Sequence, residues 1–283
     1  KCALPISKMG GCMGKKVGGL NERTTDELHA IMNACGFWAL KEDWLTDFPA
    51  QTYNAPIKVS MPSKVMALYR RMQDEFILEL DAATVITAEM VITQAMKLQQ
   101  ISSGWIYDDN HRVHSLAEPD EMAKYQVPLD IMSSIGDRGK LVIFAFYRPT
   151  IDRLIAMFRH SMGIDPAVIV GGIDPGLIAE HKRQFNSRNG TPVIICQTKA
   201  GSATHTLLGD QDHRPCHSML FFENTFSSID RGQAEDRIHR IGQRYPCTYD
   251  DIVSSPAEMK PLIALRNNEK IIEAVIEGVR TKW

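Results

Sequence analysis

Short apolar runs alternate with amphipathic segments along the second half of the chain. Residues 141–145 (LVIFA) contain no polar side chain, which is typical of a strand buried on both faces of a parallel sheet. Comparable runs lie at residues 167–170, 192–196 and 218–222, with a shorter candidate at 250–253. Helical patterns separate them at residues 150–160, 175–185 and 227–241. This alternation predicts βαβ units and a parallel sheet flanked by helices.

The first half of the chain is mainly helical in pattern. Residues 63–80 carry apolar side chains at helical spacing, from Val65 through Tyr69 and Phe76 to Leu80. Further helices are predicted at 21–35, 88–101 and 121–135, a short strand at 55–59, and a polar, turn-rich stretch at 102–118. The tail predicts one helix over 256–279, bent near Pro261. The expected fold is therefore α/β, with a mainly helical segment before the sheet.

Composition narrows the class of protein without giving its function. The 283 residues are 44% hydrophobic and 23% charged, as in ordinary globular proteins, and the net charge is −2. A nearly neutral chain has no overall basic field, so any contact with nucleic acid must come from local patches. The six cysteines form no C-x-x-C pair, which favours a reducing, intracellular setting. No apolar run approaches the roughly 18 residues of a membrane span, so no membrane partner is expected.

Candidate chemistry lies in the loops that follow the predicted strands. In open parallel sheets these loops share one edge and carry binding residues. Arg148 follows the first strand, Gly172 the second, and Thr198, Lys199 and Gly201 the third. Glycine allows a ligand close to the backbone, while threonine and lysine supply a hydroxyl donor and a cation for phosphate. Each loop taken alone could equally be an ordinary turn.

The segment 230–243 (DRGQAEDRIHRIGQ) is the most specific in the chain. On a continuous helix, Gln233, Asp236, Arg237 and Arg240 would lie on one face and present an amide, a carboxylate and two guanidinium groups. Arginine can reach into a neighbouring site and neutralise charge on a phosphoryl group in transfer. The alternative is a solvated helix with internal Asp–Arg pairs, although Ile238 and Ile241 would also let it pack.

This segment resembles motif VI of the Swi/Snf-type helicase-like ATPases of superfamily two. The order of other segments is similar: 140–145 (KLVIFA) resembles the motif IV strand, and 197–202 (QTKAGS) resembles motif V. The resemblance covers roughly residues 22–280 and is strongest from 140 to 245. Short bridging segments look most like those of viral or bacterial members. Motif V departs from the family pattern at residues 203–207 (ATHTL), which puts the contacts made there in doubt.

The resemblance implies a C-terminal RecA-like lobe of a DNA-dependent ATPase that translocates along double-stranded DNA. Arg240, assisted by Arg237, would be the arginine finger. The resemblance also implies that Gln233, Asp236 and Gly201 bind the nucleotide. It implies contacts with the DNA backbone for Thr198, Lys199, Arg148 and Gly172. Three regions are implied: residues 1–62 as the end of the first lobe and the inter-lobe linker, 63–138 as a helical insertion, and 139–283 as the C-terminal lobe with its terminal helix.

No segment satisfies the phosphate-binding loop pattern G-x-x-x-x-G-K-[ST]; Gly14-Lys15 is followed by Lys16 and no strand precedes it. ATP and Mg²⁺ are therefore expected to be held mainly by an N-terminal RecA-like lobe of the same protein that lies outside this sequence. The chain alone is expected not to hydrolyse ATP. His213, Cys216 and His217 lack a fourth ligand at the usual spacing, so no metal site is predicted.

Three alternatives remain open from the sequence. The chain could be a lobe of the same fold that binds DNA or a partner without catalysis. It could belong to a strand-separating helicase or a nuclease-linked restriction subunit of the same superfamily. It could also be an unrelated α/β enzyme with a small-molecule pocket inside this lobe.

Overall fold

The computed structural model describes residues 48–201, 205–267 and 270–281, together with residues 26, 27, 30–32 and 34. Residues from Phe48 onward form one compact unit, and those up to Asp47 belong to another. The described residues within the predicted helix 21–35 are helical. The rest of that helix, and residues 39–47 of the predicted linker, lie outside the described residues.

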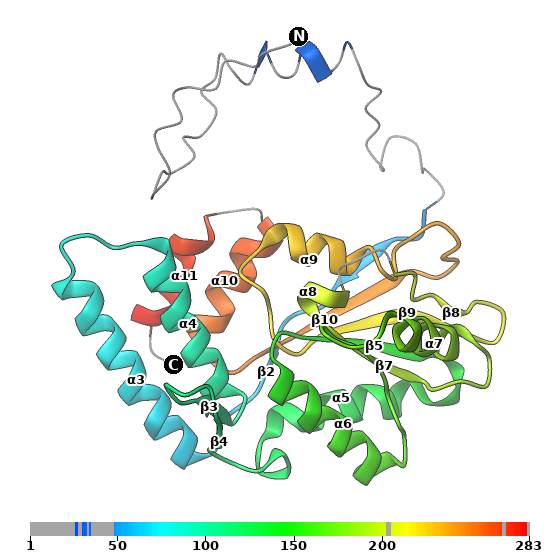
Figure 1. The fold of residues 1–283 in the computed structure, drawn as a ribbon, viewed down its shortest axis with the longest axis horizontal. Helices are drawn as coiled ribbons and strands as arrows, with labels where there is room; N and C mark the ends of the chain where they lie inside the picture. The colour runs from blue at the N-terminus through cyan, green and yellow to red at the C-terminus, as the bar shows by residue number, and fades with distance from the viewer. Residues whose placement is uncertain are drawn as a thin grey trace. The chain divides into compact units, whose positions relative to one another are not determined.

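A mostly parallel sheet forms the centre of the unit, in the order β1-β10-β9-β5-β7-β6 (Figure 1). Every neighbouring pair along this path is parallel. The strands are β1 (Gln51–Tyr53), β5 (Lys140–Ala145), β6 (Ala167–Ile169), β7 (Val193–Gln197), β9 (Arg214–Phe221) and β10 (Cys247–Val253). Two short strands lie off the path: β2 (Ile57–Lys58) pairs with β10, and β8 (Gly209–Asp210) pairs antiparallel with β9. The predicted parallel sheet is confirmed.

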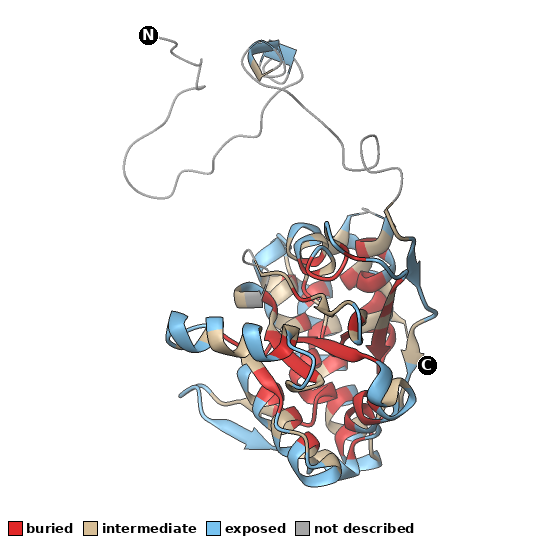
Figure 2. Ribbon diagram, turned by 90° about the vertical axis from the view of Figure 1, so that its right-hand side faces the viewer, coloured by how far each residue is buried: buried red, intermediate tan, exposed pale blue. Residues whose placement is uncertain are grey.

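Helices cover both faces of the sheet because the side chains of its strands alternate between two apolar clusters. Leu141 and Ile143 point into the larger cluster, and Val142 and Phe144 into the smaller one. The larger cluster includes residues of α5 (Ala123–Ile135) and α6 (Arg148–Met162). Residues of α7 (Pro175–Asn186), α8 (Thr198–Gly201) and α9 (Ser228–Glu235) pack on the other side. Figure 2 shows the central strands as the most buried part of the chain.

The segment before the sheet is mainly helical, as predicted. A helical pair, α3 (Ser63–Ala82) and α4 (Ala88–Ser102), packs against α11 (Ile271–Arg280), which itself packs on α10 (Pro256–Asn267). The Thr87 hydroxyl caps α4 by accepting a hydrogen bond from the amide of Met90. A hairpin of β3 (Trp105–Tyr107) and β4 (Val113–Ser115) follows, and single turns at Pro119–Glu121 and Gly136–Arg138 flank α5.

Three expectations about local structure are wrong. The polar stretch 102–118 contains the β3–β4 hairpin, which the sequence pattern did not indicate. The tail helix passes through Pro261 and ends at Asn267, so the break comes after α10. The helix predicted over 227–241 ends at Glu235. Beyond it the amides of Arg237 and Ile238 donate to carbonyls three residues back, so the chain continues as a tighter turn.

Candidate functional site

Helix α9 begins at a side-chain cap and packs through one apolar face. The Ser227 hydroxyl accepts a hydrogen bond from the amide of Asp230, at 3.2 Å. Ala234 and, just beyond the helix, Ile238 are fully buried in the smaller apolar cluster. The chain then turns through residues 236–243, which we call the arginine turn because it carries Arg237 and Arg240.

A buried ion cluster fixes the orientation of α9. The Arg231 guanidinium donates to both oxygens of Asp251, at 2.5 and 3.0 Å, and to Glu235 at 2.6 Å. It also lies flat over Phe221, with 3.4 Å between its central carbon and the ring centroid. Arg266 donates to the same carboxylate of Asp251 at 2.6 Å. Burial favours the neutral form of Asp251, yet the two guanidinium groups hold its pKa below the ordinary value.

The Arg237 side chain, at the start of the arginine turn, is fixed by hydrogen bonds to two backbone carbonyl groups. Its side chain is 8% exposed and donates to the carbonyls of Gln233, at 2.6 Å, and His205, at 3.3 Å. Burial and the positive charge of Arg240 lower its pKa, while Asp236 acts in the opposite direction. The two guanidinium groups are therefore close enough to repel each other.

Arg240 differs from Arg237 because its guanidinium is half-buried and makes no hydrogen bond or ion pair with another described residue. Gln233 and Asp236 are exposed beside it, and Ile241 is 75% exposed. Ile241 therefore does not pack as the sequence suggested. Two neighbouring cations, one of them without an anionic partner, form a place where an arriving phosphate would be stabilised.

The remaining polar residues of the turn hold its shape. The side-chain NH₂ of Gln243 donates to the carbonyls of Cys216 and Ile238, at 2.8 and 3.0 Å, and its side-chain oxygen accepts from the backbone amides of Arg244 and Tyr245. The Nε2 atom of His239 lies 2.8 Å from the carbonyl oxygen of Pro49. Neither side chain is placed to act on a reacting group.

The residues predicted to contact DNA follow three adjacent strands at the carboxyl edge of the sheet. Arg148 follows β5, Lys199 follows β7 and Gly172 follows β6, in the order of the strands themselves. All three are exposed, and Arg148 has a loose ion pair with Asp152, with 3.6 Å between Nε and Oδ1. Gly172 has a φ of +80°, a conformation that favours glycine.

Thr198 does not belong to this surface. Its side chain is 1% exposed, and its hydroxyl donates to the carbonyl of Ala145 at 3.3 Å. The buried hydroxyl links the ends of β5 and β7, so the expectation that Thr198 contacts DNA is corrected. Gly201 ends the four-residue helix α8, which packs beside α9.

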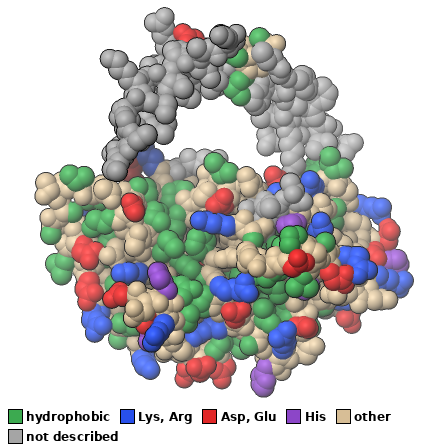
Figure 3. Space-filling model, viewed as in Figure 1, with side chains coloured by type: hydrophobic (Ala, Val, Ile, Leu, Met, Phe, Trp, Pro, Cys, Tyr) green, Lys and Arg blue, Asp and Glu red, His purple; other side chains and the backbone are tan. Residues whose placement is uncertain are grey.

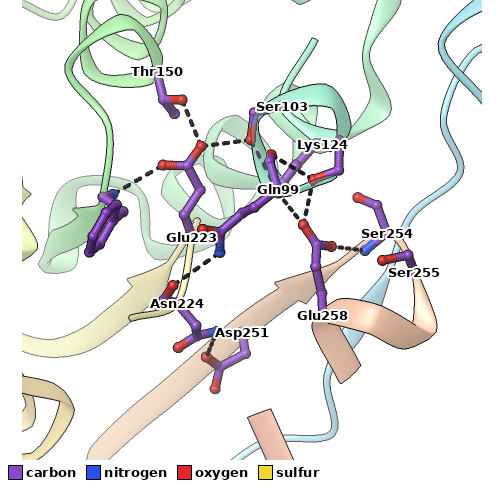
Figure 4. A network of polar contacts seen from close by, with 12 residues as sticks. Gln99, Ser103, Lys124, Thr150, Glu223, Asn224, Asp251, Ser254, Ser255 and Glu258 are labelled. Atoms are coloured by element: carbon purple, nitrogen blue, oxygen red, sulfur yellow. Dashed lines mark hydrogen bonds and ion pairs between the residues drawn. The ribbon is translucent and has the colours of Figure 1, made fainter. Parts of the chain in front are cut away.

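A second buried network, centred on Glu223, supports the same edge (Figure 4). One oxygen of Glu223 accepts from the hydroxyls of Ser103 and Thr150, at 2.6 and 2.7 Å. The other accepts from the amides of Phe146 and Tyr147, at 3.0 and 3.2 Å. Glu223 follows β9 and Ser103 follows α4, so the network joins the helical segment to the loop that carries Arg148.

An open hollow of about 810 Å³ lies beside Lys199 and the start of α9. Its walls are mixed: Phe146, Phe226 and Ile271 are apolar, while Asp230 and Lys270 are charged. Figure 3 shows hydrophobic side chains gathered on this face, with acidic and basic side chains interspersed around them. Acidic side chains thus lie among the basic ones on the face in view, and at the hollow itself Lys270 is paired with Glu273.

The described residues contain neither a cluster of metal ligands nor a membrane-spanning helix. No group of three or more His, Cys, Asp and Glu side chains converges on a possible metal site among them. No helix in the part of the chain that the structure describes is both long and apolar enough to cross a bilayer.

The order of strands and the helices on both faces define a RecA-like α/β lobe. The fold is similar to that of the Sulfolobus solfataricus SWI2/SNF2 ATPase core domain, with a TM-score of 0.60 at 17% identity. The match covers 93% of this chain and 52% of that one. The same archaeal core in complex with dsDNA matches with a TM-score of 0.61 at 14% identity, over 92% of this chain and 53% of that one.

The chain thus spans about half the length of these two structures. A shorter structure, the C-terminal part of the Fun30 ATPase domain, matches over 83% of this chain and 91% of its own length, with a TM-score of 0.57 at 13% identity. No family model and no curated protein matches the sequence. At these identities the comparisons show the fold alone, which is similar to that of SWI2/SNF2 ATPase cores and to nearly the whole of the C-terminal part of the Fun30 ATPase domain.

Proposed function

We propose that this chain is the C-terminal lobe of an ATP-driven motor that moves along double-stranded DNA. The observation that carries the proposal is the pair of neighbouring guanidinium groups in the arginine turn, of which Arg240 has no partner among the described residues. The similarity of the fold to SWI2/SNF2 ATPase cores, one of them in complex with dsDNA, supports the same function.

On the nucleotide side, the lobe contributes charge to the transferring phosphoryl group. Arg240 reaches the γ-phosphate of ATP bound in a first RecA-like lobe and neutralises the charge that develops there. Arg237, held by two carbonyl groups, keeps the local potential positive and orients the turn. Gln233 and Asp236, both exposed, face the same cleft, and Gly201 of α8 lies nearby.

The Mg²⁺ ion that accompanies ATP would be held mainly by the phosphates and the first lobe, and would supply charge neutralisation when bound. The residues of this chain act on the phosphoryl group and not on the ion.

On the DNA side, contacts run along the carboxyl edge of the sheet. Lys199 and Arg148 bind phosphates of the duplex backbone, and the flexible backbone at Gly172 lets a third phosphate approach. Such contacts carry no base sequence information, so the motor would track DNA without sequence preference. Opening and closing of the two lobes would then convert hydrolysis into stepping.

The proposal is tested by measuring ATP hydrolysis by this lobe joined to its first RecA-like lobe, with and without duplex DNA. We expect turnover to rise at least tenfold when duplex DNA is added. Turnover that is absent, or the same with and without DNA, would refute a DNA-driven motor and leave a lobe that only binds DNA or a partner. A forked duplex in the same assay separates strand separation from translocation alone.

Removal of one backbone contact gives a second prediction. Lys199→Ala is expected to weaken binding of a duplex about three- to tenfold. Because one phosphate contact is lost, the slope of log K against log salt concentration should fall by about one. The matched control is Arg183→Ala, because Arg183 is an exposed cation of α7 that pairs with Glu180. Binding can be measured by fluorescence anisotropy at several salt concentrations, and equal losses in the two variants would contradict the assignment.

A further inference from the structure

The segment 48–54, which includes β1, lies along β10 and reaches the end of α9 (Figure 1). It is the edge strand of the sheet, paired parallel to β10 from Gln51 to Tyr53. The carbonyl of Ala50 accepts from the amide of Cys247, and the amide of Asn54 donates to the carbonyl of Tyr249. The segment is therefore anchored at both ends to the strand that follows the arginine turn.

Two residues of the segment hold Glu235, the last residue of α9, which directly precedes the arginine turn. The Tyr53 hydroxyl donates to the carboxylate of Glu235, the last residue of α9, at 2.8 Å. The side-chain NH₂ of Gln51 donates to the Tyr249 hydroxyl at 3.0 Å, and that hydroxyl donates to the backbone carbonyl of Glu235 at 3.2 Å. The rings of Tyr53 and Tyr249 stack, with 5.0 Å between their centroids.

Phe48 and Pro49 contact the middle of the arginine turn at His239. The Nε2 atom of His239 lies 2.8 Å from the carbonyl oxygen of Pro49, and the rings of His239 and Phe48 meet edge to face, with 4.4 Å between their centroids. His239 immediately precedes Arg240. The 48–54 segment thus contacts Glu235, directly before the arginine turn, and His239 within it, so its contacts lie on either side of Arg237 and directly before Arg240.

We infer that the 48–54 segment positions Arg237 and Arg240, with Tyr53 as a positioning residue. This inference rests on the proposed function, in which these arginines face the nucleotide. The segment precedes the lobe in sequence, so a change in the path of the chain before Phe48 would be transmitted to both contact points. The segment would thereby couple the position of Arg240 to the path of the chain before Phe48 through direct protein contacts.

Tyr53→Phe is the decisive variant because it removes one hydroxyl and keeps the stacked ring. In this chain we expect amides of residues 236–241 to exchange hydrogen for deuterium about tenfold faster, while those of β5 are unchanged. The control is Tyr107→Phe, which removes a tyrosine hydroxyl from the β3–β4 hairpin. Unchanged exchange in the arginine turn would overturn the inference.

In the two-lobe protein, Tyr53→Phe is expected to lower kcat for ATP about tenfold with a KM within twofold of the parent. Combined with Arg240→Ala, it should cost clearly less than the tenfold that it costs alone, because much of its effect passes through Arg240. Faster exchange with an unaltered kcat would overturn the positioning role. If hydrolysis does not depend on Arg240 at all, the proposed function fails, and the exchange experiment alone decides whether the segment orders the turn.

Discussion

Arg240→Ala is expected to lower DNA-stimulated hydrolysis of ATP by about a thousandfold or more, which corresponds to about 4 kcal/mol in the barrier. The guanidinium of Arg240 has no partner among the described residues, so its removal leaves the fold of the lobe intact. The loss should appear in kcat, because the charge that Arg240 neutralises develops in the transition state. Steady-state hydrolysis by the two-lobe protein with saturating duplex DNA measures this effect.

Two controls make the result specific. Arg244→Ala removes a cation four residues further on, whose guanidinium pairs with Asp212 at 2.6 Å on the surface, and should leave turnover within about twofold. Arg240→Lys keeps the charge but not the planar fork, and should recover only part of the rate. Equal turnover in Arg240→Ala and Arg244→Ala would remove Arg240 from the mechanism. Binding of the duplex should be similar in all three variants, because the proposed contacts with the DNA backbone come from Lys199 and Arg148.

The sequence was informative where hydrophobic periodicity is strong. The runs that became β5, β7 and β9 are buried on both faces, so their composition alone revealed a parallel sheet. The strand β1 escaped detection because all three of its residues are exposed and polar or aromatic, and only pairing with β10 makes them a strand. A sequence pattern records burial well and edge pairing poorly.

The candidate site was predictable in its residue types and not in its geometry. The motif placed Arg237 and Arg240 in one segment, and helical periodicity placed them on one face, whereas in the structure Arg237 is buried and Arg240 is half-buried. The Arg237 side chain donates to the carbonyl of His205, 32 residues away in sequence, and such a contact leaves no local pattern. Arg231 was passed over for the same reason, since its partner Asp251 lies on another strand.

Glu223 gives the largest expected effect on stability, and its network is equally invisible in the sequence. Glu223→Ala is expected to lower the free energy of unfolding by about 3–5 kcal/mol. Four donors would lose their acceptor at once: the hydroxyls of Ser103 and Thr150 and the amides of Phe146 and Tyr147. The Nζ atom of Lys124 would keep its contact with Glu258, at 3.3 Å.

Glu223→Gln separates the loss of acceptors from the loss of charge. Its oxygen can still accept from the two amides, and its NH₂ can donate to the two hydroxyls, so a smaller loss of about 1–2 kcal/mol is expected. The surface control Asp212→Ala should change stability by less than about 1 kcal/mol. Denaturant unfolding of the chain measures all three variants. A loss for Glu223→Ala no larger than that for Asp212→Ala would mean that the helical segment is held to the sheet by apolar packing alone. The predicted order would show that this carboxylate fixes the loop carrying Arg148 to the helices behind it.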